Sequence, residues 1–224
     1  MALAPMEDRE RALRRGATLV RENDPITDLF VLRSGLMMSF VILDDGSRQI
    51  LRFIFPGDLI GLSALAYSRA PEAVAALADS VVCPFERGIL TRLAIEQPRL
   101  FAAIVAMEQT ERVALTDRLA GLGRTSAKAR VASVLLDLRN QMRRLDPTLG
   151  ESFFPGLTQE EIGDATGLTA VHVNRMLRQL EEDRLIARES GRVTLLDEAR
   201  LARAANYVDR RTRQDLSWLP PPPA

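Results

Sequence analysis

Three polar side chains near the C-terminal third of the sequence carry its clearest chemistry: Asn174, Arg175 and Arg178. On a helix their three- and four-residue spacing places them on one face, which Val171 extends. A guanidinium donates two hydrogen bonds to a guanine edge or contacts phosphate, and an Asn side chain pairs with adenine. The spacing therefore predicts a surface that recognises nucleic acid.

Two short helices joined by a glycine turn are predicted to hold this face outward. Thr158 and Glu161 form a Thr-x-x-Glu capping box for the first helix. Gly167 lies where that helix should end in a left-handed residue, and Thr169 caps the second helix. This layout is typical of a helix-turn-helix, whose second helix enters a DNA groove.

The opposite face of the second helix is apolar and is predicted to face a core; it consists of Val173, Met176, Leu177 and Leu180. An ordinary helical hairpin with a solvated polar face is the alternative, and the coincidence of caps, turn and two-faced pattern favours the DNA reader. After Ser190-Gly191, residues 192–196 alternate as a short strand, which fits a β wing. The candidate DNA-binding residues are Thr169, Ala170, Val171, His172, Asn174, Arg175, Arg178 and Arg192.

Two of these candidates have individual expectations. His172, the only histidine, is expected at the edge of the groove face, as a phosphate contact or as a solvated rim residue. Val171 can make only apolar contact, for example with a thymine methyl group.

Composition limits how DNA binding could work. The chain has 224 residues, of which 46% are hydrophobic and 27% charged, as expected for one or two globular domains. Its 30 basic and 30 acidic residues cancel, so no general attraction to polyanions is predicted. Residues 157–196 carry five arginines and seven acidic residues. Recognition must therefore rest on the local placement of arginine.

Cysteine usage and motif content argue against cofactors and catalysis. Cys83 is the only cysteine, so no disulfide forms within the chain, and no Cys/His spacing suggests zinc. Cys83 lies in an apolar run and is interpreted as a small core residue, with a redox switch and a haem ligand as alternatives. No clustered acid, base or nucleophile and no Walker A motif is present. We expect no metal, no cofactor and no enzymatic activity.

Segments for export or membrane insertion are not evident. No apolar run approaches the ~18 residues of a membrane helix, and residues 1–15 lack the core of a signal peptide. We expect a cytoplasmic protein without a membrane partner.

The predicted fold class is α+β: a β-roll or jelly-roll sensor domain (1–98), a long dimerisation helix and hinge (99–124), a winged helix-turn-helix domain (125–215) and a disordered Pro-rich tail (216–224). Short apolar runs predict strands at 28–32, 37–43, 49–55 and 81–85. Asp45-Gly46 is a strong hairpin signal. Helices are predicted at about 99–122, 126–144 and 197–214.

The helix at 99–122 has an imperfect packing face, and its partner is left open. A dimer seam and the chain's own β domain are equally compatible with the pattern. Gly121 and Gly123 offer a hinge after it. The predicted packing residues are Leu100, Ile104, Met107, Ala114 and Leu122.

The chain resembles the Crp/Fnr family of bacterial transcription regulators from about Leu13 to Leu196. Residues 29–35, 45–51 and 55–62 resemble its cyclic-nucleotide-binding-type β-roll, and 157–186 resembles its winged helix-turn-helix. The resemblance implies a homodimer that binds twofold-symmetric double-stranded operators and contacts RNA polymerase.

The sensor departs from the cyclic-AMP-binding pattern of that family. Those members continue Pro-Gly-Asp-x-Ile-Gly with Glu and later carry an Arg-Ser pair for the phosphate. Here Leu62 follows Gly61, and Glu72 stands where the Arg is expected. A Glu repels a phosphate, so we expect no cyclic-nucleotide binding and an unidentified small-molecule effector, if any. Iron–sulfur members need about four thiolates, which Cys83 alone does not supply.

The reader also departs at one position. Family members often carry a Glu on the recognition helix that accepts from cytosine; Val171 holds that place, while Arg175 matches the family's motif Arg. The half-site should consequently differ from the usual one. The alternative function is a ligand-binding β-roll protein whose helix-turn-helix no longer binds DNA, which the acidic balance of 157–196 keeps open.

Overall fold

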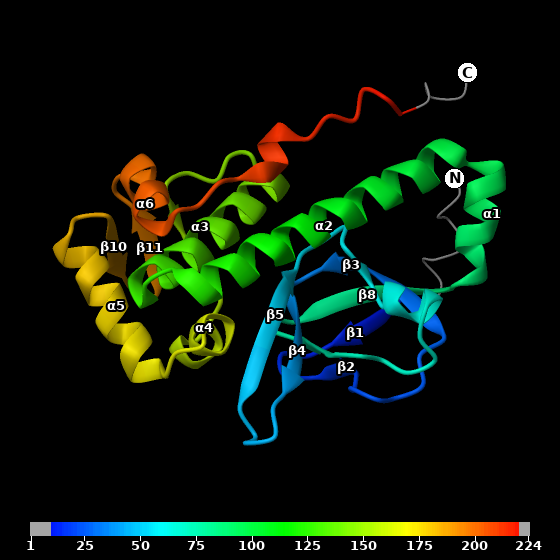
Figure 1. The fold of residues 1–224 in the computed structure, drawn as a ribbon, viewed down its shortest axis with the longest axis horizontal. Coiled ribbons are helices and arrows are strands. Elements are labelled where there is room, and N and C mark those ends of the chain that lie inside the picture. The colour runs from blue at the N-terminus through cyan, green and yellow to red at the C-terminus, as the bar shows by residue number, and fades with distance from the viewer. Residues whose placement is uncertain (1–9, 220–224) are drawn as a thin grey trace. The chain divides into compact units, whose positions relative to one another are not determined.

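The computed structural model describes residues 10–219, which form two compact units (Figure 1). The first unit comprises 10–41, 51–113 and 213–219, and the second comprises 42–50 and 114–212. The predictions for residues 1–9 and for the polyproline stretch 220–223 lie outside the described residues. Within the predicted tail, the Leu219 N–H donates to the Leu216 carbonyl at 3.1 Å and closes a turn.

The first unit is built on two four-stranded antiparallel sheets, ordered β1-β8-β3-β6 and β2-β7-β4-β5. Its strands are β1 (Arg11–Leu13), β2 (Thr18–Val20), β3 (Asp28–Ser34), β4 (Met37–Ile42), β5 (Arg48–Ile54), β6 (Leu59–Ile60), β7 (Ala73–Ala76) and β8 (Ser80–Glu86), with a short 3-10 helix η2 (Leu62–Leu65). One core cluster takes side chains from both sheets, which is the packing of a β-roll: Leu13, Phe30, Leu32, Met37, Ile54, Ile60, Val74, Ala76 and Val82.

The four strands predicted from apolar runs are present as β3, β4, β5 and β8. The Asp45-Gly46 turn is also confirmed, since Gly46 has a φ of +82° and the Asp45 carboxylate accepts from the Ser47 N–H at 2.9 Å. Strands β1, β2, β6 and β7 were not predicted. They are two to four residues long, which is too short to show an alternating pattern of apolar and polar residues.

Helices α1 (Gly88–Glu96) and α2 (Pro98–Arg124) follow the sheets. Leu100, Phe101 and Ile104 pack against a core cluster of the chain's own β domain, so the first turns of the predicted packing face serve the monomer. No side chain of α2 is fully buried. Its exposed large apolar residues are Val105, Met107, Leu115 and Leu119.

The second unit is a helical domain with a small sheet. Its elements are α3 (Ala127–Leu145), β9 (Ser152–Phe153), α4 (Gln159–Thr166), α5 (Ala170–Glu182), β10 (Ile186–Glu189), β11 (Arg192–Leu195), α6 (Glu198–Ala205) and a 3-10 turn η3 (Arg210–Arg213). Helix α3 is central, because it packs against α4, α5 and α6 (Figure 1). Strands β10, β11 and β9 form a three-stranded antiparallel sheet, which confirms the predicted wing.

The last helix is shorter than predicted. It ends at Ala205 rather than near 214, because Asn206 adopts a left-handed conformation with a φ of +51°. The Tyr207 N–H then donates to the Ala202 carbonyl at 2.9 Å, which closes a Schellman-type C-cap. Residues 207–213 consequently leave the helix axis.

Candidate nucleic-acid interface

The two helices of the predicted helix-turn-helix are capped as the sequence indicates. The Glu161 N–H donates to the Thr158 hydroxyl at 3.1 Å, and the Thr158 N–H donates to the Glu161 carboxylate at 2.7 Å. Gly167 is left-handed, with a φ of +66°. The Thr169 hydroxyl accepts from the His172 N–H at 3.3 Å and begins α5. The predicted capping box, turn and second cap are therefore confirmed.

A close approach inside α4 fixes the angle between α4 and α5, and the sequence analysis missed it. A Cβ atom on Gly163 would lie 2.3 Å from the Leu168 carbonyl oxygen. The Leu168 N–H donates to the Gly163 carbonyl at 3.0 Å across the same contact. Only glycine allows this approach. An isolated glycine within a predicted helix was the available signal.

Helix α5 presents the two faces that were predicted. Its apolar face is buried: Val173, Met176, Leu177 and Leu180. On the other side Val171 is 82% exposed, and Arg175 and Arg178 are also exposed. Asn174 is half-buried. The side chains that could contact a duplex therefore point away from the domain core.

His172 contacts one of these exposed side chains, that of Arg175. Its Nε2 atom lies 2.8 Å from a terminal guanidinium nitrogen of Arg175, one helical turn away. Since guanidinium nitrogens only donate, Nε2 is the acceptor in this contact. His172 is half-buried, and its imidazole lies against the guanidinium of Arg175.

The wing holds the eighth candidate residue. Ser190 and Gly191 form the hairpin turn with φ angles of +50° and +79°. Arg192, at the start of β11, donates to the Ser152 hydroxyl at 3.1 Å and to the Ser152 carbonyl at 2.8 Å. Its guanidinium is exposed but already tied to β9. Arg192 and the α5 residues lie on separate elements, and no contact between them is present among the described side chains.

Acidic residues near the end of α5 are paired with basic ones. Arg188 donates to the Glu181 carboxylate at 2.6 Å, and this bond lowers the pKa of Glu181. Lys128 contacts the Asp183 carboxylate at 2.7 Å. The first two turns of α5 carry no acidic side chain, and a helix N-terminus favours anions. The acidic balance of 157–196 is therefore offset locally.

In the first unit several carboxylates gather around Arg52 on β5, in contrast to the start of α5, which carries no acidic side chain. Its guanidinium contacts the Glu111 carboxylate at 3.4 Å and donates to the Leu59 carbonyl at 2.8 Å. Burial raises the pKa of both Glu72 and Glu108, while Arg52 acts in the opposite direction on each. We call these four residues, with Asp58, the Arg52 cluster. In this cluster Arg52 interacts with the carboxylates of Glu72, Glu108 and Glu111, and Asp58 acts on Glu108.

Cys83 belongs to a core cluster and lies on β8 opposite Val31, 9% exposed. An iron–sulfur cluster does not fit this single buried thiol. Residues 10–219 contain no group of three or more His, Cys, Asp or Glu side chains arranged to hold a metal ion. In the same part of the chain, every helix is too short or too polar to cross a bilayer.

Comparison with known proteins agrees with this architecture. Residues 10–97 match the cyclic nucleotide-binding domain model, and residues 129–204 match the Crp-like helix-turn-helix domain model. The transcriptional activator protein Anr of Pseudomonas protegens is 30% identical over 206 residues, which cover 91% of this chain and 83% of that protein. The nitrogen fixation regulation protein FixK of Bradyrhizobium diazoefficiens is 32% identical over 187 residues, 83% of this chain and 77% of that protein.

Solved structures give the same answer. The structure of FixK2 from Bradyrhizobium japonicum superimposes with a TM-score of 0.77 at 27% identity, and the match covers 87% of this chain and 96% of that one. Both predicted halves of the molecule are thus present in their predicted order, and the chain belongs to the Crp/Fnr family of DNA-binding transcription regulators.

Proposed function

We propose that the chain acts as a homodimer that reads a twofold-symmetric operator with the outer face of α5. Arg175 is the principal base-reading residue, held by His172; Arg178 and the wing residue Arg192 contact phosphates. Thr169, Ala170 and Asn174 complete the contact surface, and the side chain of Val171 meets a thymine methyl group. Because its target is genomic DNA, we expect it to act in the cytoplasm.

The observation that carries this proposal is the outward position of Val171, Arg175 and Arg178 on a helix whose opposite face is buried. A glycine contact and two caps hold that helix against α4, so its surface is pre-organised. Pre-organised base contacts lose less conformational entropy on binding.

The dimer is proposed to form through α2. Apolar side chains remain exposed along this helix, at Val105, Leu115 and Leu119, and the last is 73% exposed. Paired recognition helices would then meet half-sites one helical turn, about 34 Å, apart. RNA polymerase is the further partner that the family relationship suggests.

The effector is proposed not to be a cyclic nucleotide. In the Arg52 cluster the carboxylates of Glu72 and Glu108 are desolvated beside a single guanidinium. A phosphate brought near them would lose its hydration and gain mainly repulsion. Isothermal calorimetry with cyclic AMP and cyclic GMP should show no binding at millimolar ligand. Micromolar binding of either nucleotide would overturn this part of the proposal.

Selection of DNA from a random pool with the purified, ligand-free protein tests the function. We expect an enriched, twofold-symmetric sequence that binds at least 10³-fold more tightly than random DNA. Affinity should fall with salt, since phosphate contacts release counterions. No enrichment in the absence of ligand, and none with cell extract added, would favour a β-roll protein that does not bind DNA.

A further inference from the structure

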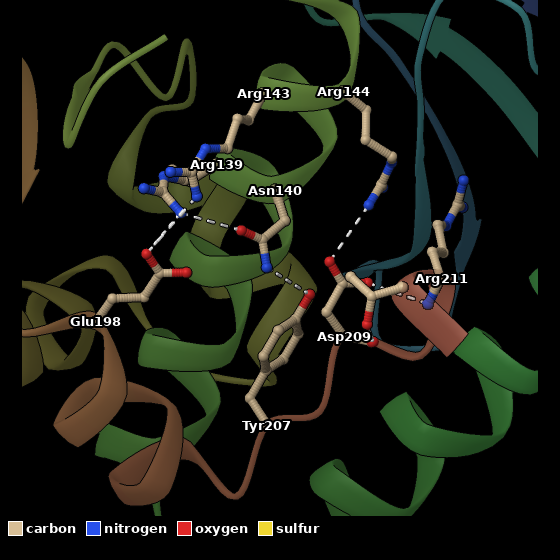
Figure 2. Close-up of polar contacts among 9 residues, drawn as sticks. Arg139, Asn140, Arg143, Arg144, Glu198, Tyr207, Asp209 and Arg211 are labelled. Carbon is tan, nitrogen blue, oxygen red and sulfur yellow. Dashed lines mark hydrogen bonds and ion pairs between the residues drawn. The ribbon is translucent and has the colours of Figure 1, made fainter. Parts of the chain in front are cut away.

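The segment that follows α6 lies against α3. Asn140 on α3 donates its amide N–H to the Tyr207 hydroxyl at 3.4 Å, and Arg144 contacts the Asp209 carboxylate at 3.5 Å (Figure 2). Burial raises the pKa of Tyr207 and lowers that of Arg144. This segment lies outside residues 129–204, the part that matches the helix-turn-helix domain model.

The same segment then reaches α2. Both Nε and one terminal nitrogen of Arg210 donate to the Asp117 carboxylate, and the second of these bonds is 2.9 Å long. Two parallel bonds of this kind fix the relative orientation of a guanidinium and a carboxylate. Asp117 in turn raises the pKa of Arg210. Three residues of the segment 207–210, namely Tyr207, Asp209 and Arg210, thus contact two different helices.

The joint between these two helices is short. Helix α2 ends at Arg124 and α3 begins at Ala127. The Thr125 hydroxyl donates back to the Gly121 carbonyl at 2.7 Å, and the Ser126 hydroxyl accepts from the Ala129 N–H at 3.2 Å. These bonds cap each helix on its own side and leave the angle at the joint to other contacts.

One such contact is direct. Arg118 on α2 and Asp137 on α3 approach to 3.8 Å, which is near the limit for an ion pair. The contacts of residues 207–210 span the same joint, and each is shorter than 3.8 Å. The contact of Arg210 with Asp117 is also bidentate. Because this segment is covalently attached to α6, it also links α6 to α2.

We propose that residues 207–210 form a strap that crosses the joint between α2 and α3 and fixes its angle. The strap acts through three contacts: Tyr207 with Asn140, Asp209 with Arg144, and Arg210 with Asp117. Since α5 packs on α3, the strap also determines how α5 is presented relative to the C-terminal turns of α2. This last consequence rests on the proposed DNA-reading function; the strap itself does not.

Pulsed electron spin resonance on the full-length chain tests the strap without DNA. Spin labels at Ala120→Cys on α2 and Leu145→Cys on α3, both exposed, report the joint in a Cys83→Ala background. The labelled chain is mixed with an excess of unlabelled Cys83→Ala chain, so that in a dimer the measured distances lie within one chain. We expect one narrow distance distribution in the parent, and a distribution at least twice as wide in Arg210→Ala and Asp117→Ala. The charge swap Asp117→Arg with Arg210→Asp should restore the narrow distribution.

Arg213→Ala is the matched control, because it removes an exposed arginine from the same 3-10 turn and leaves the Asp117 pair in place. It should keep the parent distribution. Distributions for Arg210→Ala and Asp117→Ala that equal the parent's would overturn the strap. Circular dichroism melts identify variants that fail to fold. If a single variant does not fold, the charge swap tests the strap instead, and a wide distribution in a folded charge swap would overturn it.

Operator affinity tests the consequence for α5. Arg210→Ala should change the dissociation constant for the selected operator by about three- to tenfold, and Arg213→Ala should not. A widened joint with unchanged affinity would overturn the link to α5. Failure of the parent protein to bind any selected DNA would instead overturn the proposed function, while the spin-label result would still decide the strap.

Discussion

The surroundings of α5 and the Arg52 cluster differ in how their acidic side chains are paired and solvated. Near α5, Glu181 and Asp183 are paired with Arg188 and Lys128 at the surface, away from the face with Arg175. In the first unit the carboxylates of Glu72, Glu108 and Glu111 interact with the mostly buried guanidinium of Arg52. Desolvation raises the pKa of Glu72 and of Glu108. The fold of the family is present in both units. We propose that the DNA-binding chemistry of the family is kept in the second unit and that its cyclic-nucleotide chemistry is not kept in the first.

The largest expected effect concerns the turn that positions the reader. Gly163→Ala places a Cβ 2.3 Å from the Leu168 carbonyl, so α4 and α5 must separate. We expect a loss of about 3 kcal/mol of unfolding free energy, at the upper end for overpacking, and loss of operator binding. Denaturant titration and fluorescence anisotropy measure both. Gly150→Ala, with open space around its Cβ position, is the control. Equal stability of the two variants would contradict the assigned contact.

A single base-reading side chain should have the next largest effect. Arg175→Ala removes the guanidinium and should cost about 1–3 kcal/mol of specific binding, roughly 5- to 150-fold in affinity. Non-specific binding should change much less, since phosphate contacts remain. Anisotropy with operator and random DNA measures the ratio, and exposed Arg203→Ala on α6 is the control. An unchanged ratio would mean that the reading face is misassigned.

In the first unit, removal of the negative charge of Glu72 should stabilise the fold, whereas the two substitutions above cause losses. Burial raises the pKa of Glu72 above its ordinary value of 4.5, so the folded state holds the proton more tightly than the unfolded chain. Ionisation at higher pH therefore destabilises the fold. Glu72→Gln should raise the melting temperature at pH 7, and the gain should shrink as the pH falls toward 4.5.

Thermal melts between pH 4.5 and 8 measure this gain, and Glu22→Gln, at an exposed position, is the control. A gain that stays constant over this range would show that the effect is not electrostatic. A lower melting temperature at pH 7 would show that the Glu72 carboxylate stabilises the sensor.

The smallest effect is expected for the half-buried pair of Glu181 and Arg188 in the second unit. Arg188 lowers the pKa of Glu181, so the pair contributes stability above the ordinary value of 4.5, and this is lost as the pH falls through the lowered pKa. Glu181→Gln should cost about 0.2–1 kcal/mol at pH 7 without changing DNA specificity. Denaturant titration at pH 7 and pH 3 measures it, beside the exposed Glu182→Gln. A cost that persists at pH 3 would contradict the ionic origin.

The sequence predicted most of the reader because its signals are local. The Thr158 cap, Gly167 and Thr169 each act within four residues, and the two faces of α5 follow from helical spacing. The predicted end of α6 was wrong because Asn206 is a weaker stop signal than glycine, and no glycine or proline follows it before residue 214. The contact of Gly163 with Leu168 depends on tertiary packing, which spacing alone does not reveal.

The sensor was predicted less completely because its strands depend on distant partners. Strand β7 pairs with β2 and β4, and β8 pairs with β1 and β3. Short strands of this kind are stabilised by their neighbours rather than by their own pattern. The packing of Leu100 and Ile104 on the β domain was one of two alternatives left open by the sequence. The Arg52 cluster joins residues up to about sixty positions apart and could be predicted only in part, at Glu72.

The most direct test compares the DNA selected from one random pool by the parent protein and by Arg175→Ala. A reading role for the outer face of α5 predicts a symmetric site in the parent and loss of base preference at one symmetric pair of positions in the variant, with the remaining positions unchanged. Identical selected sequences from the two proteins would contradict that role.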